Sequence, residues 1–238
     1  MQSICGIIAY LITSKYFKRS IPESIIWALT VALSNHVTLL LPITEIYFQQ
    51  NVITQVATII LMDGVILLSI IAFFLELSTK KNLKLFTFTK NLILNPFILS
   101  IIIGFLFLLF NLNINQTPVD YTLSKLAACV SPVGLFAIGI ILSFYTKNVI
   151  NKLSVSISLL KLIISPIILL LIGLAFFNAG LPAEIPGAFF VSVAPCGVTS
   201  IVLCAAYNVS PENIIKAIFV STIASIGTIF FAIQYLTL

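Results

Sequence analysis

The stretch FFVSVAPCGVTSIVLCAAYNVSP, residues 189–211, decides the fold that we expect for this chain. It is long and apolar enough to cross a bilayer, yet Pro195 and Gly197 interrupt it after a few residues. Proline removes a backbone donor and clashes with the preceding turn, so this segment predicts a broken helix. Hydrocarbon cannot hydrate the freed backbone groups, which must be satisfied by neighbouring protein or a wet cavity. Broken helices near mid-membrane form the substrate site of many secondary transporters, and we interpret the rest of the chain as a frame around this break.

The composition indicates an integral membrane protein with one membrane domain, residues 1–238. The chain is 60% hydrophobic and 8% charged, whereas soluble domains carry about 25% charged residues. Its net charge of +5 comes from short loops, where lysine and arginine set orientation, so we expect no nucleic-acid partner. No cofactor or metal is expected either, because the four cysteines lie in apolar segments without metal-ligand spacing and resemble small buried hydrophobes. They are Cys5, Cys129, Cys196 and Cys204.

Apolar runs bounded by polar residues predict an all-α, polytopic fold with about eight transmembrane helices. The basic residues follow alternate predicted spans, so the positive-inside rule predicts a multi-pass protein of the cell (inner) membrane with both termini outside the cytoplasm. The predicted spans are 2–16, 23–47, 52–76, 92–112, 122–145, 153–177, 185–206 and 211–236. The basic connections carry Lys15, Lys18, Arg19, Lys80, Lys81, Lys84, Lys90, Lys147, Lys152 and Lys216; the others carry Glu45, Asp120, Glu184 and Lys125.

A faint internal repeat relates residues 31–57 to residues 191–217 without gaps. The overlay places Asn35 opposite Pro195, and each segment has a break at the same relative position. Because the two segments run in opposite directions in the predicted topology, the repeat would be inverted, as in many transporters.

Pro195 and the amides of Gly197 and Val198 are the first candidates for a binding site. A half-helix that starts after Pro195 directs its positive end to mid-membrane, where it can bind an anion. The alternative is a simple proline kink. Cys196 and Thr199 belong to the same turn, and Thr199 is a candidate hydroxyl donor.

Asn35 is the matching polar residue on the other break, with Thr38 as a second hydroxyl donor. An interhelical hydrogen bond is the alternative role for this asparagine. His36 is the single histidine; it either titrates near neutral pH or is a buried neutral ring.

Asp63 lies in the middle of the third predicted span, where an ionisable group usually faces a cavity or a partner. It would carry a coupling proton or pair with Lys161, and a static buried ion pair is the alternative. Lys161 lies about two turns into the sixth span, and we expect it to extend toward the cytoplasmic face in preference to contacting substrate.

Five segments, in order, resemble motifs of the auxin efflux carrier family, which includes plant auxin exporters and bacterial permeases labelled malonate transporters. One departure is that Leu41 replaces the glycine of the family's first crossover. The segments are SNHVTLLLP (34–42), LNPFILSIIIGFLF (94–107), SPVGLFAIGIILS (131–143), LLKLIISPIILLL (159–171) and APCGVTSIVLCAAYNVSPENIIKAIFVSTIAS (194–225).

The resemblance implies an inverted-repeat transporter fold with two broken crossover helices, in which Asn35 belongs to the substrate pocket. The family has ten helices, and the first helix of this chain resembles the family's third, so the two opening helices are expected to be missing. Residues 1–77 and 153–238 would then form the transport domain, and 92–145 the remaining scaffold. We expect an apolar groove along the fourth and fifth spans, covered in a homodimer or by a partner.

The resulting hypothesis is a secondary transporter, a permease that moves a small organic anion by alternating access between the two broken helices. No enzyme is expected, because no nucleophile is paired with a positioned base and no phosphate-binding glycine loop is present. The alternative is a truncated, non-transporting membrane protein that folds or associates with a partner. A sodium–solute carrier fold is a third hypothesis.

Overall fold

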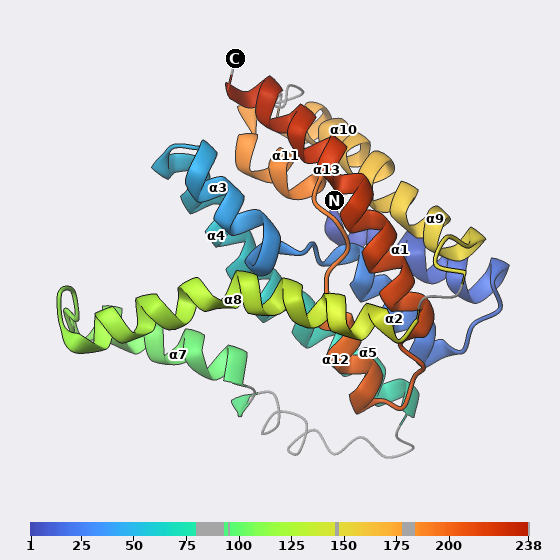
Figure 1. The fold of residues 1–238 in the computed structure, drawn as a ribbon, viewed down its shortest axis with the longest axis horizontal. Helices are drawn as coiled ribbons and strands as arrows, with labels where there is room; N and C mark the ends of the chain where they lie inside the picture. Colours follow the sequence, from blue (N-terminus) through green and yellow to red (C-terminus); the bar gives the residue numbers. More distant parts are fainter. Residues whose placement is uncertain (80–92, 95, 146–147, 178–183, 238) are drawn as a thin grey trace.

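The computed structural model describes residues 1–79, 93–94, 96–145, 148–177 and 184–237, and these are helical apart from their connections. Several residues used above lie outside this part of the chain. They are Lys80, Lys81, Lys84, Lys90, Asn95 and Lys147. The predicted all-α fold is confirmed for the described residues (Figure 1).

The N-terminal third contains three helical segments. Helix α1 (Gln2–Leu11) continues as a π-helical turn, η1 (Ile12–Tyr16), and packs along α2 (Ile21–Ala32). Helix α2 starts after Ser20, whose hydroxyl oxygen accepts a hydrogen bond from the Glu23 amide at 3.4 Å. Pro22 lies in the first turn, where a helix does not need the amide hydrogen that proline lacks. Helix α2 ends at the break around Asn35, after which η2 (His36–Leu40) and α3 (Leu41–Tyr47) follow.

The next segment is one long helical stretch from α4 (Gln50–Met62) through η3 (Asp63–Leu67) to α5 (Leu68–Thr79). In the C-terminal part, a long helical stretch is followed by a broken pair and then by a second long helix. It consists of α9 (Lys152–Leu159), η4 (Leu160–Ile164), α10 (Ser165–Phe177), α11 (Pro186–Ser192), α12 (Thr199–Ala206) and α13 (Glu212–Thr237).

Helices α7 (Pro96–Leu109) and α8 (Pro118–Ser143) form a hairpin that projects beyond the other helices (Figure 1). Helix α8 contacts η2 and α13, but none of its described side chains is buried. The expectation of an apolar groove along these two helices stays a prediction. An apolar groove that the sequence did not predict lies between α1, α2 and α5, and helix α7 contacts the bundle at η3.

Within the described residues, four continuous helices are long and apolar enough to cross a membrane. They span Gln50–Thr79, Pro118–Ser143, Lys152–Phe176 and Glu212–Thr237. Shorter apolar helices cover Ile21–Ala32 and Ile98–Leu109. The apolar runs of the sequence therefore became helices in the predicted order, and the broken ones are short because unwound chain interrupts them.

The main core surrounds α2 and is built from α1, α2, α5, α9, α12 and α13. Trp27, Ile26 and Leu29 on α2 are fully buried, as are Ile157 on α9 and Ile218 on α13. A smaller core joins α11 to α3, α4 and the end of α13 around Phe190. Both cores border the point where the two unwound segments meet, so they fix the position of the breaks.

Candidate functional site

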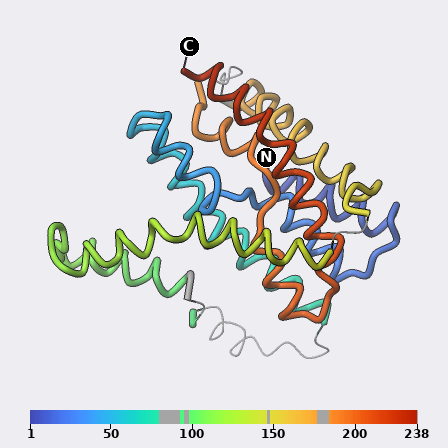
Figure 2. Tube along the Cα trace, in the orientation of Figure 1, coloured from blue at the N-terminus to red at the C-terminus, as the bar shows by residue number. Residues whose placement is uncertain are grey.

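The two unwound segments cross in an antiparallel contact at the centre of the bundle (Figure 2). Ser34 and Cys196 form an isolated β-bridge, and the Asn35 amide donates to the Pro195 carbonyl at 3.0 Å. The Ser34 hydroxyl donates to the Val191 carbonyl, also at 3.0 Å. The pair that the sequence overlay placed opposite each other, Asn35 and Pro195, is therefore in direct contact.

Neighbouring helices satisfy other backbone groups that the second break leaves free. The Gly197 amide donates to the Thr30 carbonyl at 3.0 Å, and the Cys196 amide donates to Ser221 Oγ at 3.2 Å. The Thr228 hydroxyl donates to the Val193 carbonyl at 2.9 Å. These contacts explain why unwound chain is stable in a medium without water to hydrate it.

Gly197 is required at the crossing because the two chains approach too closely for a side chain. A Cβ atom on this residue would lie 2.8 Å from both the Cβ and the carbonyl oxygen of Leu33. The carbonyl is backbone and cannot rotate away, so the glycine sets the distance between the two segments.

A cavity of about 400 Å³ adjoins the crossing. The first residues of η2 and of α12 line it on one side, and η3, α5 and Ile98 of α7 line it on another. Ser34, Asn35, His36, Thr38 and Thr199 are its polar lining residues, and the described lining contains no acidic residue. Two helix N-termini and several neutral donors therefore face the same space.

The structure divides the residues predicted for substrate binding into two sets. Asn35, His36, Thr38, Val198 and Thr199 line the cavity. Pro195, Cys196 and Gly197 are buried behind it, between α2 and α13, and do not belong to its lining. The amide of Gly197 is already bonded to Thr30, so of the two amides named from the sequence, only Val198 belongs to a residue that lines the cavity.

The asparagine on the first break is held by its own turn. The Thr38 hydroxyl donates to Asn35 Oδ1, which fixes the plane of the amide. Asn35 Nδ2 has no hydrogen-bond partner among the described residues and is buried. An unsatisfied buried donor is costly, and its position beside the cavity gives it a ligand-binding role to test.

Asp63, His36 and Gln2 form a polar cluster beside this cavity. His36 Nε2 lies 3.3 Å from Asp63 Oδ2, within ion-pair distance but without the alignment of a hydrogen bond. Gln2 Nε2 donates to the same Asp63 oxygen at 2.5 Å. Asp63 and His36 are buried and each begins a π-helical turn, a local distortion that occurs often at functional sites.

Lys161 corrects the expectation that this side chain extends to the cytoplasmic face. It is fully buried within η4, and its Nζ has no hydrogen-bond partner in the described part of the chain. The predicted ion pair with Asp63 is also absent there, since Asp63 is paired with His36 and Gln2 instead. Helices α13 and α1 pack against this turn and enclose the lysine before its stem can reach the surface.

Sequence reasoning did not identify Gln2, Ser221 or Thr30 as parts of the site. Gln2 carried a usable signal, because an amide inside an apolar span usually has a partner. The other two carried none, since hydroxyl residues recur throughout membrane helices and Thr30 acts through its backbone carbonyl.

The fold and the crossing define a helical membrane protein of the broken-helix type. A family model described as membrane transport protein matches residues 1–233. The chain therefore belongs to this family, which is the auxin efflux carrier family of permeases that its motifs resemble, and it is a multi-pass membrane transporter. A search of curated proteins finds no match.

Proposed function

We propose that this permease moves a small organic anion by alternating access and holds its carboxylate in the cavity beside the crossing. The observation that carries the proposal is the contact between the two breaks, which directs the first turns of η2 and α12 into one space. Helix N-termini favour anions through their free amides and their dipoles. The same lining contains neutral donors and no described acidic residue, although Asp63 lies next to it, against His36.

In this proposal the cavity-lining set contacts the substrate directly. Asn35 Nδ2 supplies a donor that has no other described partner, and Thr38 orients it through Oδ1. Thr199 is exposed at the start of α12 and offers a hydroxyl. Pro195, Cys196 and Gly197 act indirectly, because they keep the second segment unwound and positioned.

We further propose that the Asp63–His36 pair carries the coupling proton, if transport is coupled. The carboxylate and the imidazole are 3.3 Å apart and both titratable, so gain or loss of one proton changes the charge at the cavity wall. Lys161 is another buried titratable side chain of the bundle. Binding of an anion and protonation of this cluster would then favour each other.

Alternating access in this proposal is a movement of the bundle that carries both breaks relative to the α7–α8 hairpin. The hairpin contacts the bundle mainly through η2 and α13, and α8 is otherwise exposed. Eight spans, an inverted repeat and termini outside the cytoplasm of the inner membrane belong to the same proposal. A homodimer or a partner protein would cover the exposed hairpin.

The test is uptake of radiolabelled malonate and acetate into proteoliposomes that contain the purified chain, with choline as a cation control. Asn35→Ala is expected to lower carboxylate uptake at least about tenfold, because a buried donor to a charged group contributes roughly 1.5–3 kcal/mol. Asn51→Ala is the matched control, since Asn51 is an exposed asparagine on α4. Equal loss in both variants would contradict the site.

Two further outcomes separate the hypotheses. Asp63→Asn should keep carboxylate exchange while abolishing its dependence on an imposed pH gradient, and unchanged dependence would exclude Asp63 as the proton carrier. A folded, monodisperse protein that moves neither carboxylate would favour the non-transporting alternative.

A further inference from the structure

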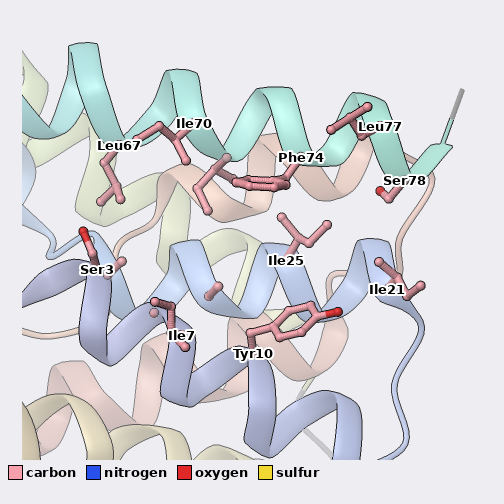
Figure 3. Close-up of a pocket in the computed structure, with 14 residues that line it drawn as sticks. Ser3, Ile7, Tyr10, Ile21, Ile25, Leu67, Ile70, Phe74, Leu77 and Ser78 are labelled. Carbon is pink, nitrogen blue, oxygen red and sulfur yellow. The ribbon is translucent and has the colours of Figure 1, made fainter. Parts of the chain in front are cut away.

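An apolar groove lies between α1, α2 and α5 (Figure 3). Helices α1 and α5 form its walls and α2 its floor, and its volume is about 660 Å³. We call it the α1–α5 groove. Representative lining residues are Gly6, Tyr10, Ala28, Ile71, Phe74 and Leu77.

The floor of the groove is deep because α1 and α2 pack very closely. A Cβ atom on Gly6 would lie 3.2 Å from the Ala28 carbonyl oxygen and 3.2 Å from Ala32 Cβ. The groove is open along its rim, where the side chains of Ile7 and Phe74 are 60% and 50% exposed. Small residues on the floor and large exposed residues on the walls give a channel shaped for an unbranched apolar chain.

The length of the groove matches one leaflet of a bilayer. Along α5 it extends from Leu67 to Leu77, which at 1.5 Å per residue is about 15 Å. The hydrocarbon core of a membrane is about 30 Å thick, so the groove covers roughly half of it. A transmembrane helix of another chain needs the full thickness, whereas one acyl chain needs only its own leaflet.

Basic residues gather at one end of the groove. Figure 3 shows Ile21, Leu77 and Ser78 at that end, with Ser3 and Leu67 at the other. Lys15 is exposed in η1, at the end of the helix that begins with α1, and Lys18 is exposed in the connection that precedes Ile21. The Arg19 amide donates to the Thr13 carbonyl at 3.0 Å, which ties this connection to the end of α1.

Nearby acidic groups only partly offset this charge. Glu23 lies 3.5 Å from Arg19 and neutralises that guanidinium. Glu76 is on α5, where the helical period turns it about 160° from Phe74 and about 100° from Leu77, away from the groove. Lys15 and Lys18 therefore leave a positive charge where the groove reaches the membrane surface.

We propose that the α1–α5 groove binds one acyl chain of an anionic phospholipid, whose headgroup lies against Lys15 and Lys18. Apolar lining, a length of one leaflet and positive charge at one end together fit this ligand. An exposed lysine contributes about a fivefold factor in affinity for an anionic membrane surface. The lipid would lie against α2 and α5, the helices next to the crossing, and would hold them together.

The experiment is native mass spectrometry of the purified full chain with equal amounts of phosphatidylglycerol and phosphatidylcholine that have identical acyl chains. We expect one retained lipid per chain and a preference for phosphatidylglycerol. Lys15→Gln/Lys18→Gln should lower this preference about ten- to thirtyfold. The matched control is Lys125→Gln/Lys152→Gln, which removes two exposed lysines elsewhere. An unchanged preference in the first double variant would overturn the headgroup assignment.

A second variant tests the acyl chain. Ala28→Leu fills the floor of the groove and should lower retention of both lipids at least about fivefold, while Ala137→Leu on exposed α8 should not. If Ala28→Leu does not fold, Ile70→Trp fills the groove from its 47% exposed wall position. Retention at the level of the unmodified protein in both folded variants would overturn the proposal. A dimer peak that Ala28→Leu abolishes would instead identify a second copy as the occupant.

Discussion

Gly197→Ala is the substitution that most directly tests the crossing of the two breaks. The added methyl group would lie 2.8 Å from the Leu33 carbonyl oxygen, so the two segments must separate. Overpacking of this kind costs roughly 1–3 kcal/mol. Separation also weakens the hydrogen bond from the Gly197 amide to the Thr30 carbonyl, which adds about 1 kcal/mol. We therefore expect a loss of about 2–4 kcal/mol in the free energy of unfolding.

The cost arises from packing and not from the backbone conformation, because Gly197 does not have a positive φ. Gly139→Ala and Gly227→Ala are suitable controls, since a Cβ atom at either position meets nothing within 4 Å. Both are in helices, where alanine is favoured over glycine by up to about 1 kcal/mol. The measurement is denaturant-induced unfolding in mild detergent, with carboxylate uptake as a second readout. Stability of Gly197→Ala within about 0.5 kcal/mol of the unmodified protein would refute the close crossing.

Three other predictions concern different parts of the chain. Lys161→Met should raise the free energy of unfolding by about 1–4 kcal/mol, because it removes a buried amine without a described hydrogen-bond partner. The control Lys152→Met changes an exposed lysine and should have no effect. Lower stability of Lys161→Met would show that the amine is satisfied in the folded protein. Gly134→Ala should loosen the packing of α8 on η2, because the added Cβ atom would lie 2.6 Å from Thr38 Cγ2. The expected result is faster amide hydrogen exchange in η2, and unchanged exchange would count against the contact between Gly134 and Thr38. A reporter active only outside the cytoplasm and fused after Leu238 should be active, and activity of a cytoplasmic reporter there would reverse the proposed topology.

Local sequence signals predicted the helices well. Each apolar run became helix because backbone groups in hydrocarbon must bond within their own segment. The starts of the runs were also readable, as in α2, where Ser20 and Pro22 form a local cap that needs no distant contact.

The positions of the two breaks followed from the sequence for a related reason. Proline at position 195 forbids a regular helix locally, and the overlay of residues 31–57 on residues 191–217 located the other break at Asn35. The overlay only aligned these two residues, and the 3.0 Å hydrogen bond between them is a property of the folded chain.

The detailed site depended on tertiary structure. Gly197 was predicted to offer its amide to a ligand, but helix α2 passes so close that this amide bonds to Thr30. Asp63 was considered with Lys161, yet the fold brings Gln2, 61 residues away in sequence, to the same carboxylate oxygen. Contacts across such separations leave no periodic signal in the chain.

By itself the sequence determined that this protein is helical, crosses a membrane and unwinds at two places. The hydrophobicity of a run and the helix-breaking effect of a proline are local, because each acts on the few residues around it. Only the tertiary structure decided which polar groups share a cavity and which are enclosed. The burial of Lys161 illustrates the difference, since a lysine in an apolar helix reaches the surface or stays inside according to the helices packed around it.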